Sequence, residues 1–296
     1  MRRAVSVLAV LALAGAAVFW WVTRPVVAGA SVLDGITPDL AQGELVFHAG
    51  GCASCHSADK ADGEAKLVLS GGRAFASPFG TFYAPNISSD PEHGIGGWSA
   101  LDLYNAMKHG VSPGGRHYFP AFPYTSYVRA TAEDIMSLHA YMQTLPADAT
   151  ANRAHDVGFP FNIRRSLGGW KVLFGSEGWV VEADLTEEEA RGRYLAEALG
   201  HCGECHTPRN VLGGPDYGRW LAGAPNPTGS GRIPNITPAK FDWSKADIVE
   251  YFTSGFTPEF DTVGGHMVDV VENLSKLPRE DRAAIAAYLK KVPGVE

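Results

Sequence analysis

The chain opens with a continuous apolar segment that differs from everything after it. Arg2 and Arg3 precede an uncharged apolar run over residues 4–22, and Trp20 and Trp21 stand near the end of that run. As a helix, a run of this length spans about 28 Å, close to the thickness of a bilayer's hydrocarbon core. The apolar core of a secretory signal peptide is shorter, about 7–15 residues.

We therefore expect residues 1–30 to form a signal-anchor helix that stays attached and crosses the membrane. The paired tryptophans are typical of a membrane interface, which favours retention. The alternative is a cleaved signal peptide, because the small residues "AGA" at 28–30 form an acceptable cleavage site before Ser31. Both interpretations export the rest of the chain and leave the two arginines in the cytoplasm.

After residue 30, short segments of helical periodicity alternate with loops rich in Gly, Pro, Ser and Asn. Thr131 precedes a run in which apolar residues recur at helical spacing, and Thr186 and Glu189 fit a capping box. Ser99 and Ser244 are placed as N-caps of two further helices. No segment alternates convincingly as a strand, so the predicted fold class is all-α.

The same blocks occur twice, in the same order. The pairs are "APNISSD" with "IPNITPA", "GWSALDLYNAMKHGVSP" with "DWSKADIVEYFTSGFTP", and "TAEDIMSLHAYMQTLP" with "PREDRAAIAAYLKKVP". Matched blocks in constant order indicate two copies of one domain. We expect tandem domains at 31–146 and 185–296, joined by an aromatic-rich connection at 147–184 that has no counterpart in the repeat.

The net charge of the chain indicates which binding partners are compatible with it. The formal net charge is −7, and the chain without residues 1–30 carries 22 basic against 32 acidic residues. We therefore expect no nucleic-acid partner, whereas the acidic surface suits a basic electron-transfer protein.

Each predicted domain carries one Cys-x-x-Cys-His motif, "CASCH" at 52–56 and "CGECH" at 202–206, and these hold all four cysteines of the chain. A structural zinc site needs four ligands, but the two cysteine pairs lie far apart in separate copies. A thioredoxin-like dithiol favours a βαβ context, and a disulfide within either motif has poor geometry on a helix.

Covalent haem attachment gives every residue of the motif a task. The two thiols add to the porphyrin, and the adjacent histidine ligates the iron. We therefore predict two covalently bound haem c groups, one on Cys52, Cys55 and His56, the other on Cys202, Cys205 and His206.

The blocks "GGCASCH", "GVSPGGRHYFPAFPYTSY", "GHCGECHTPRN" and "GGHMVDVVENLSKLPREDRAAIAAYL" resemble the membrane-anchored cytochrome c subunits of periplasmic alcohol and gluconate dehydrogenases. The resemblance covers nearly all of residues 35–293 and implies class I cytochrome c domains. Those relatives often carry three haem domains, whereas this chain has two motifs. A methionine at the position of Met267 is the distal iron ligand in the family, so the resemblance implies His/Met ligation of the second haem.

The first domain departs from this pattern. The family reads Pro-Ala-Met-Pro-Tyr where this chain reads "PAFPY", so Phe122 replaces the methionine ligand. We expect the haem on His56 to be five-coordinate or weakly ligated, with Phe122 on its distal side and His117 as the alternative ligand.

The predicted function is electron transfer rather than catalysis. The donor is expected to be the catalytic subunit of a periplasmic dehydrogenase, and the acceptor an oxidase or soluble cytochrome of the respiratory chain. The haem domains would face the periplasm from the inner membrane. The alternatives are a dihaem enzyme of peroxidase or thiosulfate dehydrogenase type, reacting at an open first haem, and a gas sensor.

Overall fold

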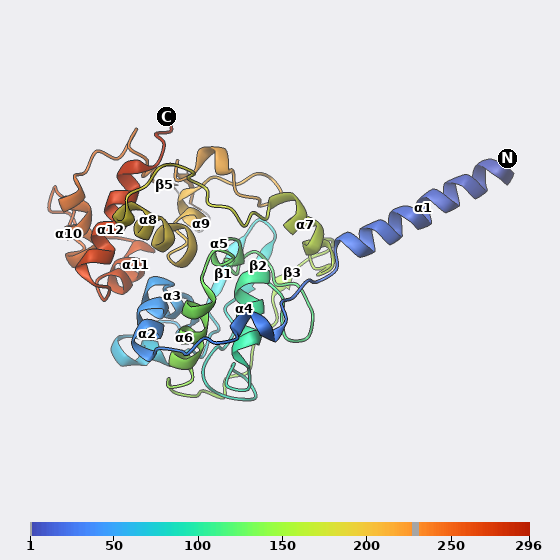
Figure 1. Ribbon diagram of the computed structural model, residues 1–296, viewed down its shortest axis with the longest axis horizontal. Coiled ribbons are helices and arrows are strands. Elements are labelled where there is room, and N and C mark those ends of the chain that lie inside the picture. The colour runs from blue at the N-terminus through green and yellow to red at the C-terminus, as the bar shows by residue number, and fades with distance from the viewer. Residues whose placement is uncertain (1, 227–230) are drawn as a thin grey trace.

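The computed structural model describes residues 2–226 and 231–296, and it shows a helix-rich body from which one long helix projects (Figure 1). That helix, α1 (Arg2–Val22), has no buried residue. Within the described residues it is the single helix long and apolar enough to cross a membrane. The exposure of α1 ends abruptly at Thr23, which is 1% exposed.

The first half of the body contains η1 (Ala30–Leu33), α2 (Leu40–Ala49), α3 (Cys52–His56), η2 (Gly63–Leu67), β1 (Ala74–Ser77), β2 (Gly80–Tyr83), α4 (Ala100–His109), α5 (Tyr124–Tyr127) and α6 (Ala132–Met142). The connection contributes β3 (Asp156–Val157) and α7 (Ser166–Phe174). The second half contains α8 (Glu187–Arg193), η3 (Tyr194–Leu199), α9 (Gly203–His206), η4 (Tyr217–Arg219), β4 (Ala224–Pro225), β5 (Arg232–Ile233), α10 (Lys245–Ser254), α11 (Met267–Leu274) and α12 (Arg279–Lys291).

The predicted helix starts are confirmed. Ser99, Thr186 and Ser244 each form a complete capping box with the acidic residue three positions later, at the starts of α4, α8 and α10. The Thr131 hydroxyl accepts from the Asp134 N–H at the start of α6. Each cap satisfies N–H groups that a helix leaves unpaired at its first turn.

Both halves use the same helix crossing. In the first half α2 crosses α6, and a Cβ placed on Gly43 would lie 2.1 Å from the Ser137 carbonyl oxygen. In the second half α8 crosses α12, and a Cβ on Gly192 would lie 1.9 Å from the Ala284 oxygen. Glycine is therefore required at both crossings, since any side chain would force the helices apart.

The second copy holds one more residue than the first between this glycine and its motif. Gly43 precedes Cys52 by nine positions, whereas Gly192 precedes Cys202 by ten. The chain absorbs the extra residue in the π-helical turn η3, where the Gly200 N–H donates to the Leu195 oxygen at 2.6 Å. Single π turns inside helices commonly occur at functional sites.

The fold is rich in helix, as predicted, and short strands that the sequence did not indicate accompany the helices. The β1–β2 hairpin pairs Ala74 with Tyr83, and β3 adds a third antiparallel strand along β2. A second pair, β4–β5, has two residues in each strand. These strands have at most four residues, too few for alternation to stand out in the sequence.

One continuous cluster of buried apolar side chains runs through both halves, from Phe47 and Ile135 in the first to Leu195 and Tyr288 in the second. The connection contacts both halves as well. β3 pairs with β2, and the Trp170 indole N–H on α7 donates to the Leu212 oxygen at 2.9 Å. The predicted domain boundaries stay a prediction, and the core is shared across them.

Candidate haem-binding sites

Each Cys-x-x-Cys-His motif occupies a single helical turn that follows a longer helix. The first motif forms α3, and in the second Cys202 precedes α9. After each turn the chain folds back in the same way. The Gly71 N–H donates to the His56 oxygen at 2.7 Å, and the Gly223 N–H to the His206 oxygen at 2.7 Å. Both glycines have positive φ, 74° and 79°, in a conformation that glycine tolerates best.

The Nδ1 atoms of the two motif histidines make equivalent hydrogen bonds. His56 Nδ1 lies 2.8 Å from the Pro85 oxygen, and His206 Nδ1 lies 2.9 Å from the Pro234 oxygen. A carbonyl can only accept, so Nδ1 carries the proton and Nε2 keeps its lone pair for a metal. Burial lowers the pKa of both imidazoles, which favours the neutral, ligating form.

The thiols of the motifs are suited to becoming thioethers. Burial raises the pKa of Cys52 to about 12, that of Cys55 to about 11 and that of Cys202 to about 12. Zinc binding requires thiolates, which this environment disfavours, whereas a thioether carries no charge. Across residues 2–226 and 231–296, no group of three or more His, Cys, Asp or Glu side chains is placed to hold a metal ion.

Buried hydrogen-bond donors without partners lie beside the second motif, and they fit a cofactor that carries carboxylates. Thr125 Oγ1 donates to Glu204 Oε1 at 2.9 Å, which packs α5 against the second motif. On the same segment, Tyr124 Oη and Arg129 Nη2 are buried without a hydrogen-bond partner. Buried polar groups are nearly always paired, and the carboxylates of haem supply acceptors of the required charge.

The two motif segments touch each other. His201 Nε2 donates to the Gly50 oxygen at 3.2 Å, joining the residues that stand just before the two motifs. Tyr127 packs edge-on against His201, with ring centroids 5.8 Å apart. Burial raises the pKa of Tyr127 far above its usual value, and the nearby thiols of Cys52 and Cys55 add a smaller contribution in the same direction. Tyr127 therefore lies between the two predicted haem sites.

The predicted distal residues occupy different settings. Met267 is half-buried, packs against the main core and begins α11. Phe122 is also half-buried and packs on Tyr127, with centroids 5.7 Å apart. The roles of Met267 and Phe122 at iron stay predictions.

His117 is not available as a distal ligand. Its Nε2 lies 2.9 Å from the Thr23 oxygen, and its Nδ1 lies 3.1 Å from Lys171 Nζ. Both ring nitrogens are thus engaged at the junction between α1 and α7.

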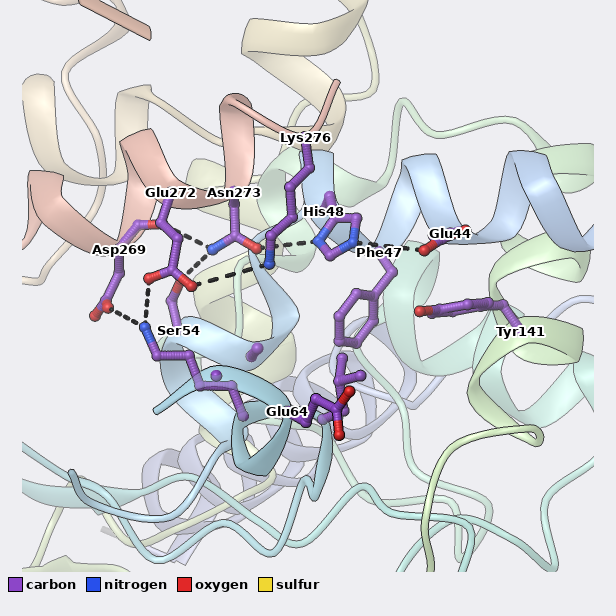
Figure 2. Close-up of a pocket in the computed structure, with 14 residues that line it drawn as sticks. Glu44, Phe47, His48, Ser54, Glu64, Tyr141, Asp269, Glu272, Asn273 and Lys276 are labelled. Carbon is purple, nitrogen blue, oxygen red and sulfur yellow. Dashed lines mark hydrogen bonds and ion pairs between the residues drawn. The ribbon is translucent and has the colours of Figure 1, made fainter. Parts of the chain in front are cut away.

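A cavity of about 260 Å³ lies beside the first motif, between α2, η2 and α11 (Figure 2). Its lining includes Ser54 and Phe47 but neither Cys52, Cys55, His56 nor Met267. The lining combines apolar side chains with charged ones from both halves, and none of the predicted haem-binding residues belongs to it, so the cavity is a groove between the halves and not the predicted haem cleft.

The groove is bridged by polar contacts that the sequence did not reveal. His48 Nδ1 lies 3.4 Å from Asn273 Oδ1, and Asn273 Nδ2 donates to Ser54 Oγ at 3.0 Å (Figure 2). Lys66 pairs with Glu272 at 2.5 Å and with Asp269 at 3.5 Å. These partners are about 200 positions apart, and no local pattern marks them.

Comparison with known proteins agrees with the sequence resemblance. The cytochrome c family profile matches residues 40–146. The chain is 58% identical to a diheme cytochrome c-type protein of Cereibacter sphaeroides, over all of both chains. It is 39% identical to the fructose dehydrogenase cytochrome subunit of Gluconobacter japonicus, over 98% of this chain and 59% of that one. It is 36% identical to the gluconate 2-dehydrogenase cytochrome c subunit of Pantoea cypripedii, over 85% and 59%.

The chain thus spans the whole of the diheme relative and less than two thirds of these two dehydrogenase subunits. The names of these relatives describe cytochrome subunits and not catalytic ones, as the sequence predicted. The cytochrome c fold implies covalently bound haem c, and the motif residues fit that group. The chain therefore belongs to the cytochrome c family, and it is an electron carrier.

Proposed function

We propose that the protein is a membrane-anchored dihaem cytochrome c that passes electrons from a dehydrogenase to a respiratory acceptor. In this proposal residues 31–146 and 185–296 are two haem domains joined by residues 147–184. Cys52, Cys55 and His56 hold one haem, and Cys202, Cys205 and His206 hold the other, with Met267 as its second axial ligand. Bound haem supplies the one-electron chemistry.

The observation that carries the proposal is the matched construction of the two motifs. Each histidine donates from Nδ1 to a proline carbonyl, at 2.8 Å for His56 and 2.9 Å for His206. Such an outer contact fixes the ring and raises its strength as a ligand. Both copies of the segment, 150 positions apart, keep the same arrangement, which supports the same use for both.

Contact between the motif segments supports a relay. Gly50 and His201 are hydrogen-bonded, and Tyr127 packs on His201. This contact joins the two predicted sites through packed side chains rather than through solvent. In this proposal the two haem sites, which exchange electrons, share one continuous core.

The partners and location follow from the relatives and from α1. The fructose and gluconate relatives are named as dehydrogenase subunits, which supports a dehydrogenase as electron donor. α1 anchors the chain in the inner membrane with the haem domains in the periplasm, because Arg2 and Arg3 precede the apolar run. An oxidase or a soluble cytochrome is the acceptor.

Haem-stained denaturing gels test the assignment. Replacing Cys52 and Cys55 by Ala should halve the haem that stays bound per chain, and replacing Cys202 and Cys205 as well should remove the rest. The matched control is Ser54→Ala, which changes the same turn without touching a thiol. Haem lost completely from the unaltered protein under acid extraction would contradict covalent attachment.

A further inference from the structure

Exposed apolar side chains gather where α1 joins the body. Leu173 on α7 is 69% exposed, Phe159 in the preceding turn is 81% exposed, and Val211 is 92% exposed. Ile163, Val172 and Leu212 are also exposed. Single exposed apolar residues are ordinary, but a group of them marks an interaction surface.

These side chains come from three segments that lie together. The Ser166 N–H donates to the Ile163 oxygen at 3.0 Å, so the turn at 159–163 leads straight into α7. The Trp170 indole donates to the Leu212 oxygen at 2.9 Å, which brings residues 211–212 against the same helix. α7 lies on the side of the body from which α1 leaves (Figure 1).

The end of α1 is fixed to this surface. A Cβ on Gly168 of α7 would lie 2.4 Å from the Thr23 oxygen, so the two backbones are in direct contact. Arg165 Nε donates to Thr23 Oγ1 at 3.0 Å, and its guanidinium stacks over the Trp20 ring at 4.1 Å. Because α1 cannot swivel freely on the body, the side that faces the membrane is set by these contacts.

Charge distinguishes this surface from the rest of the protein. Residues 157–176 contain no acidic residue, in a chain whose net charge is −7. Arg164 and Arg165 are half-exposed there, whereas Lys171 donates to main-chain oxygens inside the body. Apolar side chains next to arginines suit the headgroup region of a bilayer. There the apolar side chains enter the hydrocarbon, and the guanidinium groups meet lipid phosphates.

We propose that Phe159, Ile163, Val172, Leu173, Val211 and Leu212 form a second membrane contact, the anchor face, which lies in the outer headgroup layer of the bilayer that α1 crosses. This rests on the proposed anchoring by α1. The occupant is lipid, since the face is continuous with the end of α1 and lies beside Arg164 and Arg165. The contact fixes the tilt of the haem domains over the membrane.

The test uses spin labels on the full-length holoprotein in vesicles of phosphatidylethanolamine and phosphatidylglycerol. One label is placed at Leu173→Cys and, as a control, one at Phe260→Cys. Phe260 is 87% exposed and belongs to the segment between α10 and α11, on the side away from α1 (Figure 1). Collisions with lipid-soluble oxygen and a water-soluble nickel chelate are compared by electron paramagnetic resonance.

We expect the oxygen-to-nickel collision ratio at Leu173 to exceed that at Phe260 several-fold. Equal ratios at the two sites, in protein that resists carbonate extraction, would overturn the anchor face and leave anchoring by α1 intact. Loss of the protein into the carbonate supernatant would instead refute the anchoring itself.

A second position, Val211→Cys, guards against a Leu173 variant that does not fold. If the labels are shielded from the nickel chelate only after a dehydrogenase subunit is added, the surface binds a protein partner. That result would overturn the lipid contact. Haem staining of each variant is run alongside, so that loss of the cofactor is seen separately.

Discussion

The imidazoles of His56 and His206 are oriented by the chain itself. Each donates to a proline carbonyl about 30 positions later, in the loops "PNIS" and "PNIT". In those loops Asn86 and Asn235 accept from Ser88 and Thr237, at 2.9 Å and 2.8 Å, which fixes the position of the preceding proline. The repeated loop therefore supports the predicted histidine ligand, a role that the sequence match alone did not identify.

The two predicted haems differ on their distal sides, where the first has Phe122 and the second Met267. Met267→Ala should abolish the weak red absorption band that reports an iron–thioether bond, because Phe122 cannot supply sulfur. Phe122→Met should roughly double that band and raise the potential of the first haem. Both changes are read in the absorption spectrum of the oxidised protein and in a redox titration.

Met107 provides the control for these variants. It is 4% exposed in the core, so Met107→Leu should leave the band unchanged. A thioether band that survives in Met267→Ala would mean that the first haem has a sulfur ligand after all.

At the scale of elements, α7 is tied to the body by one buried lysine. Lys171 Nζ donates to the oxygens of His109 and Gly110, at 2.5 Å and 2.8 Å, and to His117 Nδ1. Its Nζ also lies over the Tyr124 ring. Burial lowers the pKa of Lys171 from 10.5 to about 7.

This lysine makes stability depend on pH. Between about pH 7 and 10.5 the unfolded chain binds a proton that the folded chain does not, so the unfolding free energy rises with pH. The gain between about pH 6.5 and 9.5 is on the order of 3 kcal/mol. Burial also lowers the pKa of His117, which adds a loss of stability on the acid side.

Denaturant unfolding of the full chain in detergent measures this effect. Lys171→Met should flatten the rise with pH, while Lys171→Arg, which stays charged, should hold the protein at the less stable level throughout. A rise that is equally steep in wild type and Lys171→Met would contradict the buried lysine as its source.

Element positions were largely predictable, because capping residues and helical periodicity are local signals. The β1–β2 hairpin was missed since its strands are short, and α7 was missed since its "GG" pair disfavours a helix. Glycine is needed at position 168 of α7 because a Cβ there would collide with the Thr23 backbone. The π turn η3 accommodates one extra residue between the glycine at the helix crossing and the second motif. The sequence alone does not show that both of these positions are fixed in space.

Across the whole molecule, the π turn places one carboxylate at the meeting point of all three parts. Glu197 is fully buried and accepts from the N–H groups of Val180 and Val181, at 2.6 Å and 3.1 Å, in the connection. It also accepts from the Tyr288 hydroxyl at 2.5 Å, and Arg129 of the first half lies 3.9 Å away. Such contacts between remote segments carry no sequence pattern and could not be predicted.

Glu197→Gln should therefore destabilise the entire body. The amide would turn a donor toward groups that are themselves donors, at a cost on the order of 3 kcal/mol, or roughly 10 °C in Tm. Circular dichroism melting checks this. Glu189→Gln, which changes an exposed capping box, is the control and should cost below about 1 kcal/mol. Equal melting points for the two variants would remove Glu197 from this central role.

The pairing of Ala28 with Asn105 bears on how the protein is made. The Ala28 N–H donates to Asn105 Oδ1 at 2.7 Å, and Asn105 Nδ2 donates back to the Ala28 oxygen at 3.4 Å. Ala28 is the first residue of the small-residue segment that a signal peptidase would read. Proteases act on segments that open from the fold, and here both main-chain groups are occupied. We therefore expect a peptidase to cleave at residues 28–30 only while the pairing of Ala28 with Asn105 is open.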